Sequence, residues 1–232
     1  MKKTLILCDF DGTITESDVT DTLLNHFATK EWEEVGKAYL KGTISHAEMN
    51  TKFAQLLNAS PMQVNALLKK IPLRPGFSKL LSEINYANVS FVVISSGWDY
   101  YIERILQKYN PRFLSRISLE DNKDNTVLQI IANKISLDPI NKMWNLQLLW
   151  DKNSCRFSSP CKGHIVKTLR KHFNQIIVIG NSESDICMAE NATIIFAFGT
   201  LQQICKNKGI PTENVSNFYQ VKEYLSSIHV ID

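Results

Sequence analysis

The chain has 232 residues, of which 44% are hydrophobic, and this length and composition suit one α/β core with a modest inserted lobe. The formal net charge is only +3, with basic and acidic residues mixed along the chain, so neither nucleic acid nor an acidic membrane surface is an expected partner. We expect neither a membrane span nor a signal peptide, because the apolar runs are short. The five irregularly spaced cysteines fit a reducing compartment, so a cytoplasmic location is expected.

The most informative segment is the run Asp9-Phe10-Asp11-Gly12-Thr13-Ile14-Thr15, which follows an apolar strand expected over residues 5–8. Two carboxylates at the C-terminal end of a buried strand lie where open α/β sheets bind their ligands. Gly12 allows a sharp turn and a close approach of the backbone to a ligand. This pattern favours phosphoryl transfer with Asp9 as the nucleophile, while Asp11 handles the proton of the leaving alcohol. The alternative is a pair of solvated acids in a turn.

This run resembles the first motif of the haloacid dehalogenase (HAD) superfamily, most of whose members are magnesium-dependent phosphatases. The resemblance implies an α/β fold with a HAD-like Rossmannoid core, a parallel sheet and a small inserted helical cap. It further implies Mg²⁺ as the cofactor and a small phosphorylated metabolite as the substrate, hydrolysed through an aspartyl-phosphate. The sequence leaves a monomer and a homodimer equally open.

Residues 16–73 favour helices over strands, and we expect them to form the cap, inserted between residues 1–15 and residues 74–232 of the core. Glu16 and Asp18, at the start of this segment, are candidates for selecting the substrate alcohol. Capping of the helix that follows is the alternative explanation for both acids. Helix signals in the segment are apolar spacing over 18–27, a capping-box pattern at Ser45-His46-Ala47-Glu48, and Ser60-Pro61 ahead of a further apolar pattern.

The strongest strand signal covers residues 89–94 and ends at Ser95, to which the resemblance assigns the phosphate-binding hydroxyl. Ser96 and Gly97 offer backbone N–H groups just before a helix expected to begin near Trp98. On the alternative interpretation, the two serines only cap that helix.

Lys162 begins a later helical pattern, where the resemblance expects a lysine that balances the charges of Asp9 and of the phosphate. Cys155, Cys161 and His164 lie close to it in the sequence and raise the question of a zinc site. A closed structural zinc site needs four ligands, and only these three local candidates exist.

The last motif follows a strand expected over residues 175–180. The HAD pattern has Gly-Asp-x-x-x-Asp here, and in this chain Asn181 replaces the first acid while Asp185 is retained. An Asn oxygen can bind magnesium but lacks the full charge of a carboxylate, so we expect weak affinity. Glu183 is a possible substitute ligand. Because of Asn181, a phosphate-ester-binding pseudoenzyme and an inactivated mutant remain as alternatives. A phosphotransferase or mutase is a separate alternative.

Residues 121–160 are expected to contain a hairpin or an extended insertion, because residues alternate in polarity around 127–135. The helical insertion between the first two motifs is similar to the HAD branch that includes phosphoserine phosphatases. Within that branch, three further features resemble methionine-salvage phosphatases and phosphoethanolamine/phosphocholine phosphatases. They are Ile71-Pro72-Leu73-Arg74-Pro75-Gly76, the extended stretch before a Cys-containing loop and Lys162, and the C-terminal pattern of Cys205, Gly209-Ile210-Pro211, Phe218 and Val221. The other expected core elements are a helix over 77–84, strands over 116–119 and, as the last one, 193–198, and helices from Leu201 and Phe218. The expected roles are catalysis by Asp9, Asp11, Ser95 and Lys162, substrate or phosphate binding by Gly12, Ser96, Gly97 and Asp18, and metal binding by Asp9, Asp11, Asn181 and Asp185.

Overall fold

A computed structural model describes residues 4–87, 89–107, 115–116, 129–149, 155 and 157–231. Within these ranges, no helix combines the length and the apolar character needed to cross a bilayer. In chain order, the elements are β1 (Thr4–Cys8), η1 (Phe10–Ile14), α1 (Val19–Phe27), α2 (Glu31–Leu40), α3 (His46–Leu56), α4 (Pro61–Leu68), α5 (Phe77–Tyr86), β2 (Val89–Trp98), α6 (Asp99–Gln107), β3 (Ser115–Arg116), β4 (Gln129–Leu137), β5 (Trp144–Gln147), α7 (Lys162–Leu169), β6 (Gln175–Gly180), η2 (Glu183–Asp185), α8 (Ile186–Ala189), β7 (Ile194–Ala197), α9 (Gly199–Asn207), β8 (Glu213–Asn214) and α10 (Phe218–Ser227).

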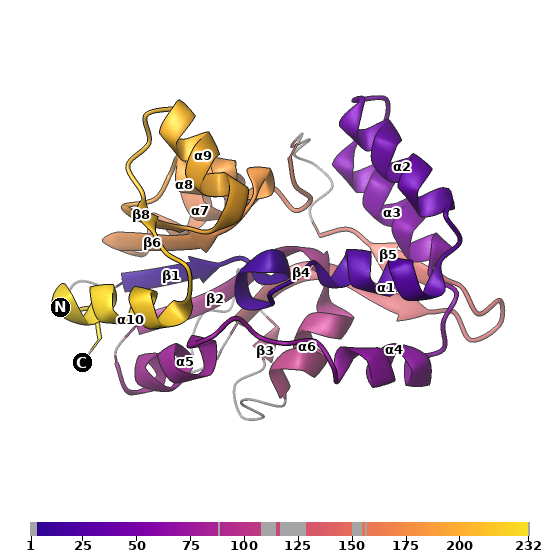
Figure 1. The fold of residues 1–232 in the computed structure, drawn as a ribbon, viewed down its shortest axis with the longest axis horizontal. Helices are drawn as coiled ribbons and strands as arrows, with labels where there is room; N and C mark the ends of the chain where they lie inside the picture. The colour runs from indigo at the N-terminus through magenta and orange to yellow at the C-terminus, as the bar shows by residue number, and fades with distance from the viewer. Residues whose placement is uncertain are drawn as a thin grey trace.

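One sheet runs through the centre of the molecule (Figure 1). Its strands follow the order β3-β4-β2-β1-β6-β7-β8 and pair in parallel, while β5 pairs antiparallel with β4. This confirms the expected α/β fold with a parallel sheet. Because β1 has β2 on one side and β6 on the other, the ends of these three strands meet at one edge of the sheet, where the strand order reverses.

Alternate residues of β1 enter two different cores, as the strand geometry requires. Leu5 and Leu7 pack in the cluster that contains residues of α7, and Ile6 and Cys8 pack in the larger cluster with residues of α5, α6 and α10. Figure 1 shows α7, α8 and α9 on one face of the sheet and α5, α6 and α10 on the other. Burial of both faces explains why the central strands are almost continuously apolar in the sequence.

The three helices with sequence signals between the first two motifs are present as α1, α3 and α4, and each has a capped N-terminus. Helix α2, between α1 and α3, had no separate signal and has no side-chain cap. Asp18 caps α1 by accepting a hydrogen bond from the backbone N–H of Asp21. Capping boxes precede α3 at Ser45 and α4 at Ser60. Helices α2 and α3 pack against each other at the right of Figure 1.

Three sequence expectations need correction. Strand β2 continues to Trp98, with a register shift after Ile94, instead of ending at Ser95, while α6 begins at Asp99, next to its expected start. Strand β4 is part of the core sheet rather than of an insertion, and only its second half forms the expected hairpin with β5. The strand expected to be last is followed by β8, which at two residues is too short to produce a periodic signal. The strand expected over 116–119 is described only at Arg116, which lies in β3.

Candidate functional site

The C-terminal ends of β1 and β2 meet the helices α1–α3 around one cavity of about 400 Å³. Asp9, Asp11, Ser95, Ser96 and Lys162 all line it, so the structure brings together the first three predicted motifs. The cavity also includes Ser182, Glu183 and Ser184 from the fourth motif, as well as Gly97 and Asp18.

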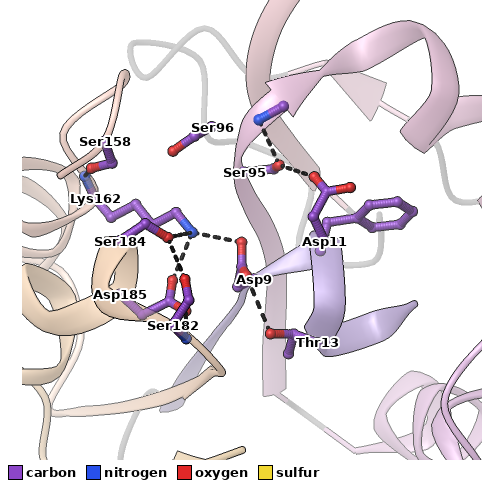
Figure 2. A network of polar contacts seen from close by, with 12 residues as sticks. Asp9, Asp11, Thr13, Ser95, Ser96, Ser158, Lys162, Ser182, Ser184 and Asp185 are labelled. Atoms are coloured by element: carbon purple, nitrogen blue, oxygen red, sulfur yellow. Dashed lines mark hydrogen bonds and ion pairs between the residues drawn. The ribbon is translucent and has the colours of Figure 1, made fainter. Parts of the chain in front are cut away.

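Lys162 is buried in the site and bridges two carboxylates (Figure 2). Its Nζ is 2.5 Å from Asp9 Oδ1 and 2.6 Å from Asp185 Oδ1, and the lysine is only 1% exposed. The other oxygen of Asp185 accepts hydrogen bonds from the backbone N–H groups of Asn181, at 2.8 Å, and of Ser182, at 3.1 Å. Asp185 is therefore bonded through both oxygens and fixes the lysine from behind.

The buried charges at this point do not balance. Burial and the charge of Asp185 raise the pKa of Asp9 to about 7, while Lys162 acts in the opposite direction. Burial alone would lower the pKa of Lys162, but the attraction of Asp185 and Asp9 keeps that pKa above its usual value. With Lys162 charged, two carboxylates face one ammonium, and the remaining negative charge favours a further cation.

Asp11 is held by three donors. Its Oδ1 accepts from the backbone N–H of Val19 at 3.0 Å, and its Oδ2 accepts from Tyr101 Oη at 2.6 Å and from Ser95 Oγ at 3.1 Å. Burial raises the pKa of Asp11 to about 6; the hydrogen bond from Tyr101 opposes the shift and the charge of Asp9 adds to it. A carboxyl group with this pKa can both donate and accept a proton near neutral pH.

Glycine is required at Gly97 because the Tyr101 hydroxyl occupies the space of a side chain. A Cβ at this position would collide with Tyr101 Oη and with Asp11 Oδ2. The N–H groups of Gly97 and Gly12, both expected to hold phosphate, already donate within the protein. Gly97 donates to Ser95 Oγ at 2.9 Å, and Gly12 donates to Thr15 Oγ1 and to the Ser17 carbonyl, each at 3.3 Å.

One oxygen of Asp9 and one of Asn181 both lie within hydrogen-bonding distance of the Thr13 hydroxyl. Thr13 Oγ1 is 3.2 Å from Asp9 Oδ2 and 3.1 Å from Asn181 Oδ1. A Cβ at Gly12, whose φ is +70°, would collide with the Asn181 amide, so the glycine permits this close approach. A carboxylate and an amide oxygen are hard donors of the type that magnesium accepts, and this donor set therefore fits the expected ion.

Ser96 joins the core to the helices that cover the cavity. Its carbonyl accepts hydrogen bonds from Asn50 Nδ2 of α3, at 2.6 Å, and from Asn133 Nδ2 of β4, at 2.8 Å. Trp98 Nε1 in turn donates to Asn50 Oδ1 at 2.7 Å. The Oγ of Ser96 is buried and has no partner among the described residues.

Arg74 and Tyr101 are functional neighbours that the sequence analysis left out of the site. The Arg74 guanidinium donates to the carbonyl of Thr13 at 2.9 Å and to that of Gly12 at 2.6 Å, and it stacks on Phe198. It therefore fixes the turn that follows Asp9. In the sequence, Arg74 has the features of an ordinary exposed arginine and Tyr101 those of a core aromatic, so only the long-range contacts reveal their roles.

The remaining candidates occupy distinct positions. Asp18 combines its capping role with surface exposed to the cavity, whereas Glu16 is exposed and does not line it. Cys155 hydrogen-bonds with Cys161 and with a third thiol, that of Cys187, which no sequence signal linked to them. Within the part of the chain that the structure describes, no group of three or more His, Cys, Asp or Glu side chains has the arrangement of a metal site.

Comparison with known proteins gives relatives that span nearly the whole chain. The 2-hydroxy-3-keto-5-methylthiopentenyl-1-phosphate phosphatase of Bacillus pumilus (strain SAFR-032) is 28% identical over 237 residues, covering 98% of this chain and 93% of the relative. The protein of the same name from Exiguobacterium sp. (strain ATCC BAA-1283 / AT1b) is also 28% identical, covering 98% of this chain and 99% of its own length.

Solved structures of phosphoserine phosphatase share the fold. A phospho-aspartyl intermediate analogue of that enzyme matches with a TM-score of 0.68 and 20% identity, and a substrate-bound complex matches with 0.69 and 19%. Each match covers 97% of this chain and 99% of the other. A family model described as haloacid dehalogenase-like hydrolase matches residues 6–190. That range covers most of the chain and contains every site residue predicted from the sequence, so the chain belongs to the haloacid dehalogenase-like hydrolase family.

Proposed function

We propose that this protein is a magnesium-dependent phosphomonoesterase that acts on a small phosphorylated metabolite through an aspartyl-phosphate on Asp9. The observation that carries the proposal is the buried Asp9–Lys162–Asp185 arrangement, of which Asp9 and Lys162 line the same cavity as Asp11. The ammonium orients the nucleophile, and a second carboxyl group with a pKa of about 6 lies two residues further on. The relatives named as phosphatases support the same reaction class.

The proposed reaction consists of two successive displacements at phosphorus. In the first, an Asp9 oxygen forms a bond to phosphorus, the ester P–O bond breaks, and Asp11 gives its proton to the departing alkoxide. In the second, Asp11 takes a proton from water, the water oxygen bonds to phosphorus, and the bond to Asp9 breaks. Lys162 and the hydroxyl groups of Ser95 and Ser96 stabilise charge on the phosphoryl oxygens.

Magnesium would be held by Asp9, by the backbone carbonyl of Asp11 and by Asn181. When bound, it supplies the positive charge that reduces repulsion between Asp9 and an anionic phosphate. We assign Asp185 to the positioning of Lys162 rather than to the metal, because both of its oxygens are already bonded inside the protein.

We further propose that residues 16–73 form a cap on a core made of residues 1–15 and 74–232. The two connections lie side by side where the chain leaves and re-enters the core. Thr15 forms a β-bridge with Leu73, and the backbone N–H of Arg74 donates to the Ile14 carbonyl at 2.8 Å. Helices α1, α2 and α3 contribute the upper wall of the cavity, so this segment would exclude water and select the alcohol.

Phosphate release from a panel of phosphomonoesters, measured across a magnesium titration, tests the proposal. We expect turnover in the wild-type protein and none in Asp9→Asn, which retains the shape of the side chain but not the nucleophile. Asn181 favours a second candidate, a pseudoenzyme that binds phosphate esters without hydrolysing them. Phosphate release by Asn181→Asp but not by the wild-type protein would indicate that candidate. Absence of phosphate release from both the wild-type protein and Asn181→Asp would refute the hydrolase assignment. Formation of an isomerised phosphate ester instead of free phosphate would indicate a mutase.

A further inference from the structure

Two buried side-chain polar atoms in the described part of the chain have no hydrogen-bond partner, and both belong to residues of the same cavity. They are Nδ1 of His46 and Oγ of Ser96. Buried polar groups are almost always paired, so an unpaired one requires an explanation. Because the two residues line the same cavity, one from α3 and one from β2, a ligand bound there could pair with both atoms.

His46 is held firmly at the cavity wall. It is the first residue of α3, directly after the capping box of Ser45, and its ring packs edge-on against Tyr39 with the centroids 5.6 Å apart. Asn50 follows four residues later on the same helix face and ties α3 to the Ser96 carbonyl. The imidazole therefore faces the site from a fixed position and not from a loose surface loop.

The charges of the cavity wall disfavour a second anionic group on the substrate. Lys162 is the only Lys or Arg among the described lining residues, and its ammonium already bridges two carboxylates. His46 does not add a cation, because burial, aided by Lys162, lowers its pKa to about 4. The carboxylates that line the cavity are Asp9, Asp11, Asp18, Asp21 and Glu183.

The part of the cavity wall that α2 and α3 form is mainly apolar. Trp32 and Phe53 form an edge-on pair with centroids 6.1 Å apart, and further side chains extend this surface. Such a wall suits carbon chains and offers no charge to pair with a carboxylate. The apolar and aromatic lining residues from α2 and α3 are Trp32, Tyr39, Leu40, Met49 and Phe53.

We propose that His46 contacts the organic part of the substrate, and that the cavity selects phosphomonoesters whose organic part is uncharged and carries a hydroxyl or carbonyl group for His46 Nδ1. A hydroxyl group pairs with either tautomer of a neutral imidazole, and a carbonyl pairs with the Nδ1–H tautomer. Esters whose organic part carries a carboxylate are rejected, because that carboxylate would lie near several acidic side chains and no free cation. This inference rests on the proposed function.

Glycerol 3-phosphate and 3-phosphoglycerate form a matched test pair, because they differ only in a hydroxymethyl group replaced by a carboxylate. We expect kcat/KM of the wild-type protein to be at least about tenfold higher for glycerol 3-phosphate, which is about 1.4 kcal/mol of discrimination. Equal values, or a preference for 3-phosphoglycerate, would overturn the inference.

The role of His46 is tested by the ratio of kcat/KM for dihydroxyacetone phosphate to that for phenyl phosphate, whose ring has no hydrogen-bonding group. His46→Phe keeps an aromatic ring beside Tyr39 and should lower this ratio about fivefold or more, since one neutral hydrogen bond is lost. His46→Gln should recover much of the ratio. His172→Phe, at an exposed histidine outside the cavity, is the matched control. An unchanged ratio in His46→Phe refutes the contact, and His46→Leu serves if the Phe variant does not fold.

A binding measurement separates this inference from the proposed function. If no ester is hydrolysed, the proposed function fails, but calorimetric titration of Asp9→Asn with the same matched pair still compares the ligands. Tighter binding of glycerol 3-phosphate supports the inference without turnover. Equal affinity, or tighter binding of 3-phosphoglycerate, overturns it.

Discussion

Asn181→Asp should destabilise the protein without magnesium and strengthen its response to magnesium. The Thr13 hydroxyl lies 3.1 Å from Asn181 Oδ1 and 3.2 Å from Asp9 Oδ2, so these two oxygens are at most about 6.3 Å apart. At an effective dielectric constant of about 20, two negative charges at that distance repel by about 2.6 kcal/mol. Lys162 offsets part of this repulsion, and we expect a net loss of about 1–2 kcal/mol in the free energy of unfolding.

Bound magnesium should reverse the sign of this effect. A ligand present at its dissociation constant stabilises a protein by about 0.4 kcal/mol, and one present at a hundredfold excess stabilises it by about 2.7 kcal/mol. Replacing a neutral amide by a carboxylate lowers the dissociation constant for magnesium, because a full charge then faces the ion. The same magnesium concentration is then a larger multiple of that constant, so the stabilisation is larger. At millimolar magnesium, the variant should therefore be at least as stable as the wild-type protein.

Urea unfolding followed by circular dichroism, once in EDTA and once in millimolar magnesium, measures both effects. Asn25→Asp adds the same charge at an exposed position of α1, outside the cavity, and serves as the matched control. The reasoning fails if Asn181→Asp is as stable as the wild-type protein in EDTA. It also fails if magnesium stabilises the two proteins equally.

Three further substitutions have defined outcomes. Asp185→Asn leaves Lys162 with one carboxylate and puts an amide where three hydrogen-bond donors converge. Urea unfolding should therefore show a free energy of unfolding lower by about 3–5 kcal/mol. Tyr101→Phe removes a hydrogen bond that lowers the pKa of Asp11, so that pKa should rise above about 6 and shift the pH profile of kcat/KM upward; an unshifted profile would contradict the role of Asp11. The pKa of His46 is lowered from 6.5 to about 4 in the folded protein, so the unfolded chain binds more protons between these values and stability falls as the pH falls. Because His46 is partly exposed, we expect it to lower the free energy of unfolding by no more than about 2 kcal/mol over this pH range. In His46→Phe, the free energy of unfolding should therefore fall by about 2 kcal/mol less over the same range.

The sequence predicts most of the core because its parallel strands are buried on both faces and stand out as apolar runs. Strands β1, β2 and β6 each end at a polar motif, and their meeting at one sheet edge follows from α/β topology. Strand β8 is different, because two residues carry no periodicity. The extension of β2 to Trp98 could not be predicted from the sequence either, because Ser95, Ser96 and Gly97 are residue types typical of a helix start.

Partners within the site are harder to predict than the site itself. Tyr101 reaches Asp11 across 90 positions of the chain, and Arg74 reaches Gly12 across 62. Nothing local distinguishes Tyr101 from a core aromatic, because its ring is indeed packed in the core and only its hydroxyl group acts on Asp11. The collision that a side chain at Gly97 would cause is the structural sign of this contact, and it becomes visible only in three dimensions.

The hydrogen bonds of Ser96 connect the part of the site expected to bind the organic group of the substrate with the part expected to bind its phosphate. Its carbonyl is held by Asn50 from α3 and by Asn133 from β4, while its own hydroxyl is unpaired in the described structure and faces the cavity. Asn50 therefore links α3, the helix of His46, to the backbone next to Ser95. We expect a substrate that pairs with His46 to contact both ends of this link, whereas inorganic phosphate alone would contact only the end at Ser95 and Ser96.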